Sequence, residues 1–145
     1  SGTLNIRYIE VCNVITQGYP TSIKFSSNGS DITNVGSTNA TGNFLCPAIT
    51  AGSSTSKMGA VITYQDTSGT NALNTDIVLQ LSADNGSNFS TATLTALPDF
   101  SSGIKMAKVN DLAVTAGTQL KYKILFANQA AGSKEARIRG VSLNY

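Results

Sequence analysis

The stretch Leu120-Lys121-Tyr122-Lys123-Ile124-Leu125-Phe126 decides the fold class of this chain. Apolar or aromatic residues occupy every second position from Leu120 to Phe126, and two lysines stand between them. Because successive side chains of a β-strand point to opposite faces, this pattern is typical of a strand with one buried face. The stretch therefore predicts a strand with Leu120, Tyr122, Ile124 and Phe126 inward and with Lys121 and Lys123 in solvent.

Other segments of the chain show related patterns. Residues 76–82 alternate, with Ile77, Leu79 and Leu81 on one face, and residues 57–64 are apolar on both faces, which predicts a strand buried on both faces. In residues 137–145, Ile138 falls on the face opposite Val141 and Leu143, which predicts a last strand covered on both faces near its end. We expect further strands over residues 4–8, 23–25, 44–45, 89–95 and 104–109. No helical period of 3.6 residues persists over ten residues.

Glycine next to Asn, Asp, Ser or Ala punctuates these segments, at residues 28–29, 66–69, 84–86, 101–103, 116–117 and 132–133. Such residues accept the positive φ angles that hairpin turns require. About eight or more short strands with these turns predict an antiparallel β-sandwich or jelly roll, in one domain spanning residues 1–145. The stretch from Ser26 to Ser56 is rich in Ser, Thr, Asn and Gly, and we expect a long surface loop or an edge region there.

Composition supports an all-β fold and narrows the partners. Charged residues make up only 12%, and glutamate, common on helix surfaces, occurs twice. The net charge of +2 is too small to indicate a nucleic acid partner. Seven of the ten basic residues lie in residues 105–145, so a basic face toward an anionic partner is one interpretation, and solvated outer faces of strands are the favoured one. No apolar run approaches the roughly 20 residues of a membrane span, and we expect no retained signal peptide.

The residues that catalysis usually needs are scarce. The chain has no histidine, which excludes a Ser-His-Asp triad and a histidine-ligated zinc. Cys12 and Cys46 are too few for a four-cysteine zinc site; we favour reduced thiols, with one disulfide as the alternative. No phosphate-binding or dinucleotide-binding loop is present, and the carboxylates are scattered, although two could still meet across sheets. We expect no enzymatic activity and no cofactor.

Three weaker patterns have ordinary explanations. The oxygen-rich turns at Asp66–Gly69 and Asp84–Gly86 could suit calcium, but they lack the further acids of an EF-hand and are interpreted as hairpin turns. Four Asn-X-Ser/Thr sequons, at Asn28, Asn39, Asn85 and Asn88, are interpreted as chance in a chain of this composition. Most tyrosines fall in strands, whereas Tyr19, before Pro20, is the best candidate for an exposed aromatic residue.

Three motifs in the second half of the chain resemble a known pattern. They are Ser82-Ala83-Asp84-Asn85-Gly86-Ser87-Asn88-Phe89, Gly117-Thr118-Gln119-Leu120-Lys121-Tyr122-Lys123 and Ile138-Arg139-Gly140-Val141-Ser142-Leu143-Asn144-Tyr145. This arrangement resembles a β-sandwich domain found near the C-termini of tailed-phage structural proteins, among them fibre, tail and capsid-surface proteins. The resemblance covers about half of the chain. Its motifs are turn and core positions, so they carry over no functional site.

The resemblance implies a structural protein of the virion, assembled in the host cytoplasm. A free chain of this length looks most like an oligomeric capsid decoration (cement) protein that stabilises the head, commonly as a trimer on the major capsid protein. A tail or head fibre domain, or a carbohydrate-binding module for attachment to host glycans, are the alternatives. Residues 26–56 could reach a neighbouring subunit or the shell. As contacts with another subunit or the shell we single out Tyr19, Lys57, Tyr64, Arg137, Arg139 and Tyr145.

Overall fold

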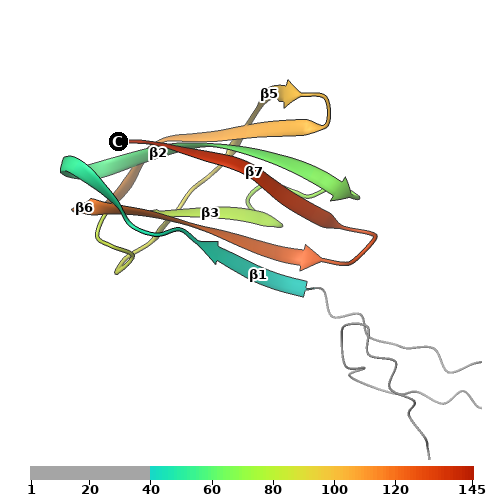
Figure 1. Cartoon of the computed structure of the whole chain (residues 1–145), viewed down its shortest axis with the longest axis horizontal. Coiled ribbons are helices and arrows are strands. Elements are labelled where there is room, and N and C mark those ends of the chain that lie inside the picture. Colours follow the sequence, from blue (N-terminus) through green and yellow to red (C-terminus); the bar gives the residue numbers. More distant parts are fainter. Residues whose placement is uncertain (1–39) are drawn as a thin grey trace, which may run out of the picture. The chain divides into compact units, whose positions relative to one another are not determined.

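The computed structural model describes residues 40–145, and within that range every regular element is a β-strand. The seven strands are β1 (Ala40–Leu45), β2 (Ile49–Ser68), β3 (Ile77–Ser82), β4 (Ser90–Thr91), β5 (Thr95–Ser101), β6 (Ile104–Gln129) and β7 (Glu135–Asn144) (Figure 1). All strand pairs are antiparallel. The predicted all-β, antiparallel fold is confirmed.

One long strand, β6, connects the whole sheet. Its first part, up to Leu120, pairs with β2 and β5, and its last part, from Lys121, pairs with β1 and β3. β7 adds to β2 and β4 adds to β3, so hydrogen bonds join the seven strands into one open sheet. Figure 1 shows the two parts of β6 in different layers, one beside β5 and β2 and the other beside β3 and β1. A closed sandwich or jelly roll remains a prediction.

The hydrophobic core lies between these layers, because side chains from both parts of the sheet form a single cluster. β2 contributes Met58, Ala60, Ile62 and Tyr64, and β3 contributes Ile77, Leu79 and Leu81, none more than 5% exposed. Leu120 and Ile124 of β6 are fully buried among them, and Tyr122 and Phe126 pack against the cluster half-buried. The alternation expected for residues 76–82 and 120–126 is therefore confirmed.

Two alternation patterns differ from expectation. Residues 57–64 bury mainly one face, because Val61 and Thr63 on the other face are only half-buried. In β7 the register with β2 slips by one residue between Ile138 and Gly140, which is a β-bulge at Arg139. The bulge reverses the phase, so that Ile138, Val141 and Leu143 all pack against the core. The prediction that both faces of the last strand are covered is wrong for this reason.

The turn expected at Ala116–Gly117 is also absent, because β6 continues through it. A Cβ atom on Gly117 would stand 2.1 Å from the carbonyl oxygen of Ala83, so the glycine serves a close approach of two chain segments. The amide of Gln119 donates to that same carbonyl at 2.9 Å. Glycines in the other predicted turns of the described part, Gly69, Gly86, Gly103 and Gly132, do have positive φ angles.

Several predictions concern residues 1–39, which lie outside the described residues. They are the strands over 4–8 and 23–25, the turn at 28–29, the contact residue Tyr19 and the state of Cys12. Of the stretch expected as a loop or edge region, residues 40–45 lie in β1 and residues 49–56 begin β2. β1 pairs only with β6 among the described strands and is an edge of the sheet.

Candidate interaction surface

An apolar groove opens between β1 and β7, with β6 as its floor. It has a volume of about 340 Å³ and is lined by Phe44, Tyr122, Ile124, Phe126, Ile138, Arg139, Gly140 and Val141. Most of these side chains are aromatic or aliphatic, and Arg139 is the single charged residue among them. A concave, mostly apolar site with one charged group is typical of a binding surface.

The aromatic wall of the groove is open to solvent. The Phe44 side chain is 52% exposed, and its ring lies 5.9 Å from the Tyr122 ring, tilted by 35°. Leu45 and Ile49, on either side of the corner at residues 46–48, are 48% and 47% exposed. Three of the five large hydrophobic residues that are exposed in the described part of the chain thus lie at the end of β1 or the start of β2, and of these Phe44 lines the groove. Exposed apolar side chains that adjoin an apolar groove mark a contact surface.

Parts of the two strand edges beside the groove, β1 from Gly42 and β7 beyond its bulge at Arg139, lack the features that usually block pairing with another strand. β5 carries Pro98 and Asp99, and β4 is only two residues long. β1, in contrast, has neither charge nor proline, and β7 is uncharged from Gly140 to Asn144, beyond the bulge. Each of these two strands has one paired neighbour among the described residues. Their outer edges can therefore accept a further strand.

The predicted contact residues lie in several places. Tyr64 is 5% exposed within the core, so little of its side chain is available to another subunit. Lys57 and Tyr145 lie together at a shallow polar depression that Asp111 and Asn144 also line. Arg137 and Arg139 are exposed on β7, and only Arg139 lines the groove, where its guanidinium donates to Gln65. The structure thus brings together Lys57 and Tyr145, and separately the two arginines.

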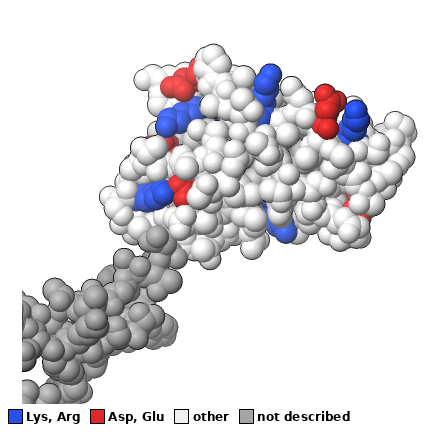
Figure 2. Space-filling view, turned by 180° about the vertical axis from the view of Figure 1, so that it is seen from behind, with Lys and Arg blue, Asp and Glu red and all other residues white. Residues whose placement is uncertain are grey.

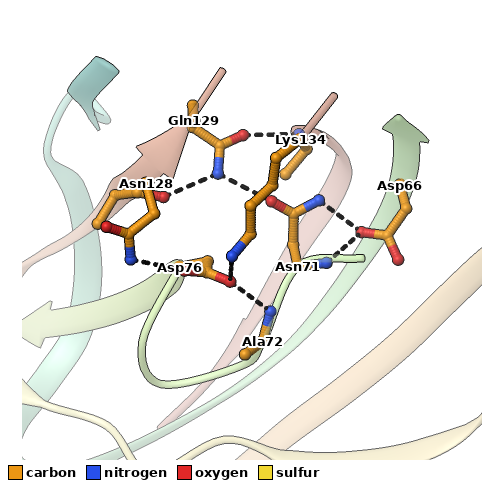
Figure 3. A network of polar contacts seen from close by, with 9 residues as sticks. Asp66, Asn71, Ala72, Asp76, Asn128, Gln129 and Lys134 are labelled. Atoms are coloured by element: carbon orange, nitrogen blue, oxygen red, sulfur yellow. Dashed lines mark hydrogen bonds and ion pairs between the residues drawn. The ribbon is translucent and has the colours of Figure 1, made fainter. Parts of the chain in front are cut away.

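A network of polar contacts joins the loop between β2 and β3 to the end of β6 and to Lys134, just before β7 (Figure 3). Asp76, 1% exposed, accepts from the amide of Ala72 at 2.8 Å, from Asn128 Nδ2 at 2.8 Å and from Lys134 Nζ at 2.6 Å. Next to it, Gln129 donates to Asn71 Oδ1 and accepts from the amide of Ala136, each at 2.8 Å. No buried polar side-chain atom in residues 40–145 lacks a partner.

The electrostatics of this network fit a structural role. Hydrogen bonds from Lys134 and then Asn128 lower the pKa of Asp76 from 3.8 to about 2. For Asp66, burial acts to raise the pKa, but hydrogen bonds from Lys105 and Asn71 outweigh burial and lower it. A carboxylate that is held ionised and surrounded by donors is a poor general base at neutral pH. We therefore assign these carboxylates to the stability of the fold.

The turn at Asp84 lies within the first of the three sequence motifs, residues 82–89. Asp84 Oδ1 accepts from Ser82 Oγ at 2.7 Å and from the amide of Asn88 at 3.0 Å, and Ser82 Oγ accepts from the amide of Gly86 at 2.9 Å. The backbone amide of Asn88, with its side chain, lowers the pKa of Asp84 to about 2. Phe89, at the end of the motif, lies under Lys123 Nζ, 4.4 Å from the ring centroid. This motif is explained as a stable turn.

The surface charges and the cysteine of residues 40–145 add no further candidate binding site. Figure 2 shows one face with few charged side chains on a mostly uncharged surface. Cys46 is a free, buried thiol whose Sγ accepts from the amide of Tyr122 at 3.0 Å. Residues 40–145 contain no cluster of three or more potential metal ligands. They also contain no helix long and apolar enough to cross a membrane.

The comparisons with known proteins found no matching family model, no similar curated protein and no similar solved structure.

Sequence reasoning missed Phe44, Phe126 and Val141 as residues of a surface. Phe44 and Leu45 are two adjacent apolar residues in a stretch of Ser, Thr, Asn and Gly, which was the available indication. Phe126 and Val141 looked like ordinary inward positions of two strands. That they meet in a groove depends on the pairing of β1 and β6 and on the bulge in β7.

Proposed function

We propose that this chain is a non-catalytic structural protein of a tailed-phage virion, and specifically an oligomeric capsid decoration protein that stabilises the head. The observation that carries the proposal is the open apolar groove between β1 and β7, together with the exposed Phe44, Leu45 and Ile49. Subunits of symmetric assemblies bury such surfaces against one another. The resemblance of residues 76–145 to domains of phage structural proteins supports the class of protein.

Proteins of this kind act through shape and burial. A subunit interface of ordinary size buries roughly 800 Å² of solvent-accessible surface on each partner, and apolar side chains at its centre contribute most of the binding energy. Only 12% of the residues in this chain are charged. The apolar groove between β1 and β7 is therefore the most distinctive contact surface in the described part. The major capsid protein and further copies of the chain are the partners that we propose.

The test combines the oligomeric state with particle stability. We expect the purified full chain to be a trimer by light scattering, and phage heads stripped of the protein to lose resistance to heat and to regain it when the protein is added back. Phe44→Ser should weaken both, whereas Phe100→Ser, at a more exposed phenylalanine on β5, should change neither. A monomer that leaves heads unchanged would refute the proposal.

A second candidate function has a specific observation in its favour. The tilted Phe44–Tyr122 pair and the Arg139 guanidinium line the same groove, and aromatic faces beside a hydrogen-bond donor suit a sugar. A carbohydrate-binding module on a fibre or tail would use such a groove to attach to host glycans. Binding of the isolated chain to a glycan array, lost in Tyr122→Ala, would favour this candidate, and imaging of the virion would distinguish head from tail.

A deletion of residues 27–43 is a poor test of either function. It would remove four of the six residues of β1, the strand that pairs with β6 and contains Phe44. The loss of that strand would disturb the fold itself. Substitutions in the full chain are therefore the better experiment.

A further inference from the structure

We infer that the groove between β1 and β7 receives a β-strand formed by residues 3–9 of a neighbouring copy of this chain. The inference rests on the proposed oligomeric function, and it names the contact that would join the subunits. Addition of a strand to an open sheet edge is a common mode of recognition, in which the backbone supplies affinity and side-chain pockets supply specificity.

The groove and the free edges suit a strand with one apolar face. Phe126, Ile138 and Val141 line the groove from the floor and one wall, and Phe44 lines it from the other wall. The uncharged edge from Gly140 to Asn144 lies beside it and has no paired neighbour on its outer side among residues 40–145. The two remaining described edges are interrupted by Pro98 or are very short. Strand addition is thus favoured at the groove over the other edges.

The sequence of residues 3–9 fits this site. Leu4, Ile6 and Tyr8 alternate with Thr3, Asn5 and Arg7, so one face of the segment is apolar and the other is polar up to Ile9, where the alternation ends. Seven extended residues span about 23 Å, and the uncharged edge of β7 beyond the bulge, residues 140–144, is five residues long and can pair with most of them. Glu10 follows the segment directly, and its carboxylate can meet the guanidinium of Arg139, whose bonded partner in residues 40–145 is the neutral amide of Gln65.

The length of chain before β1 allows the strand to be donated. Thirty residues separate Ile9 from Ala40, where β1 begins at the wall of the groove. Thirty residues span at most about 100 Å when fully extended, so the length of chain permits donation to an adjacent subunit. Were the groove filled by the chain's own segment, the described part would lose its main apolar surface for contact with another copy. Donation to a neighbour closes the groove and links the subunits at once.

Disulfide trapping in the full chain tests the inference. One tagged chain carries Ile6→Cys, a second carries Val141→Cys, both also carry Cys12→Ser, and the two are coexpressed and mildly oxidised. We expect a cross-linked pair that contains both tags, since a disulfide requires Cα atoms within about 7 Å. The matched control replaces Val141→Cys by Ser102→Cys, an exposed position in the turn next to β5, and should give no cross-link.

The outcomes separate this inference from the proposed function. An oligomer without the cross-link would overturn strand donation and leave the proposed function standing. A bond within one chain, formed when both cysteines are placed in it, would also overturn it in favour of the chain's own segment. A monomeric chain would refute the proposed function and this inference together.

A substitution pair gives an independent measurement. Ile6→Asp should raise the concentration at which the oligomer dissociates by at least about tenfold, because it places a charge in the apolar groove. Asn5→Asp, on the polar face of the same segment, should change that concentration less than about twofold. Equal effects of the two substitutions would contradict the predicted orientation of the segment.

Discussion

Two regions of this molecule lie at the margins of the same core. In one the polar side chains have hydrogen-bond partners, and in the other apolar side chains are left open to water. In the network around Asp76, each buried polar side-chain atom has a partner, and the loop between β2 and β3 is tied to the ends of β6 and β7. The groove between β1 and β7 instead leaves aromatic and aliphatic side chains open to water. A region with all its interactions made stabilises the fold, and a region with apolar surface left over is available for binding.

The largest effect should come from removing the centre of the network. Asp76→Ala leaves the Lys134 ammonium, the Asn128 amide and the Ala72 N–H without their acceptor. We expect the free energy of unfolding in urea to fall by about 2–4 kcal/mol, less than for a fully buried ion pair because Lys134 can turn toward water. Asp99→Ala, at an exposed carboxylate on β5, is the control and should have little effect. A loss under about 1 kcal/mol for Asp76→Ala would mean that the network is not important for stability.

Acid should weaken the same region before it affects the groove. The pKa of Asp76 is about 2 in the folded chain and near 3.8 when unfolded, so its stabilising contribution is present above about pH 4 and is lost as the pH falls toward 2. We expect the melting temperature to fall across this window, with a smaller fall in Asp76→Asn. Asp84 also has a pKa of about 2 and accounts for part of the remaining dependence. An unchanged pH profile in Asp76→Asn would show that the ion pair does not carry the effect.

A groove substitution should affect stability much less. Phe44 is half exposed, and its main described contact is the tilted pair with Tyr122. We expect Phe44→Ser to lower the unfolding free energy of the dilute, dissociated chain by about 1 kcal/mol or less. The measurement compares this loss in unfolding free energy with the larger loss expected for Asp76→Ala. A loss as large as that of Asp76→Ala would place Phe44 among the core residues rather than on a binding surface.

The smallest effect should come from the outer face of β6, which belongs to neither region. Lys123→Met removes the ammonium that lies 4.4 Å from the centre of the Phe89 ring and keeps most of the aliphatic side chain. We expect a loss of about 0.5 kcal/mol, typical of an exposed cation–π contact. The value provides a baseline for the other variants, and it should be unaffected by the oligomeric state. A dependence on oligomeric state would mean that the outer face of β6 also contacts another chain.

Much of the local structure was predictable from the sequence. The alternation in residues 76–82 and 120–126 identified two central strands, because the period of two is a property of the extended backbone itself. The glycines at 69, 86, 103 and 132 identified turns for a similar reason, since positive φ angles disfavour other residues. The absence of histidine restricted the chemistry without any knowledge of the fold.

What the tertiary structure decided lies between segments distant in the chain. Gly117 looked like a turn residue, but it serves a close approach to Ala83, and β6 runs on to join both layers. The bulge at Arg139 reversed the face of Val141, and the pairing of β1 with β6 placed Phe44 opposite it. Such outcomes depend on which strands pair and in which register, and a periodic pattern read along one strand contains no information about its partner. The sequence by itself determined the alternating strand segments at residues 76–82 and 120–126, and only the pairing of strands produced the groove.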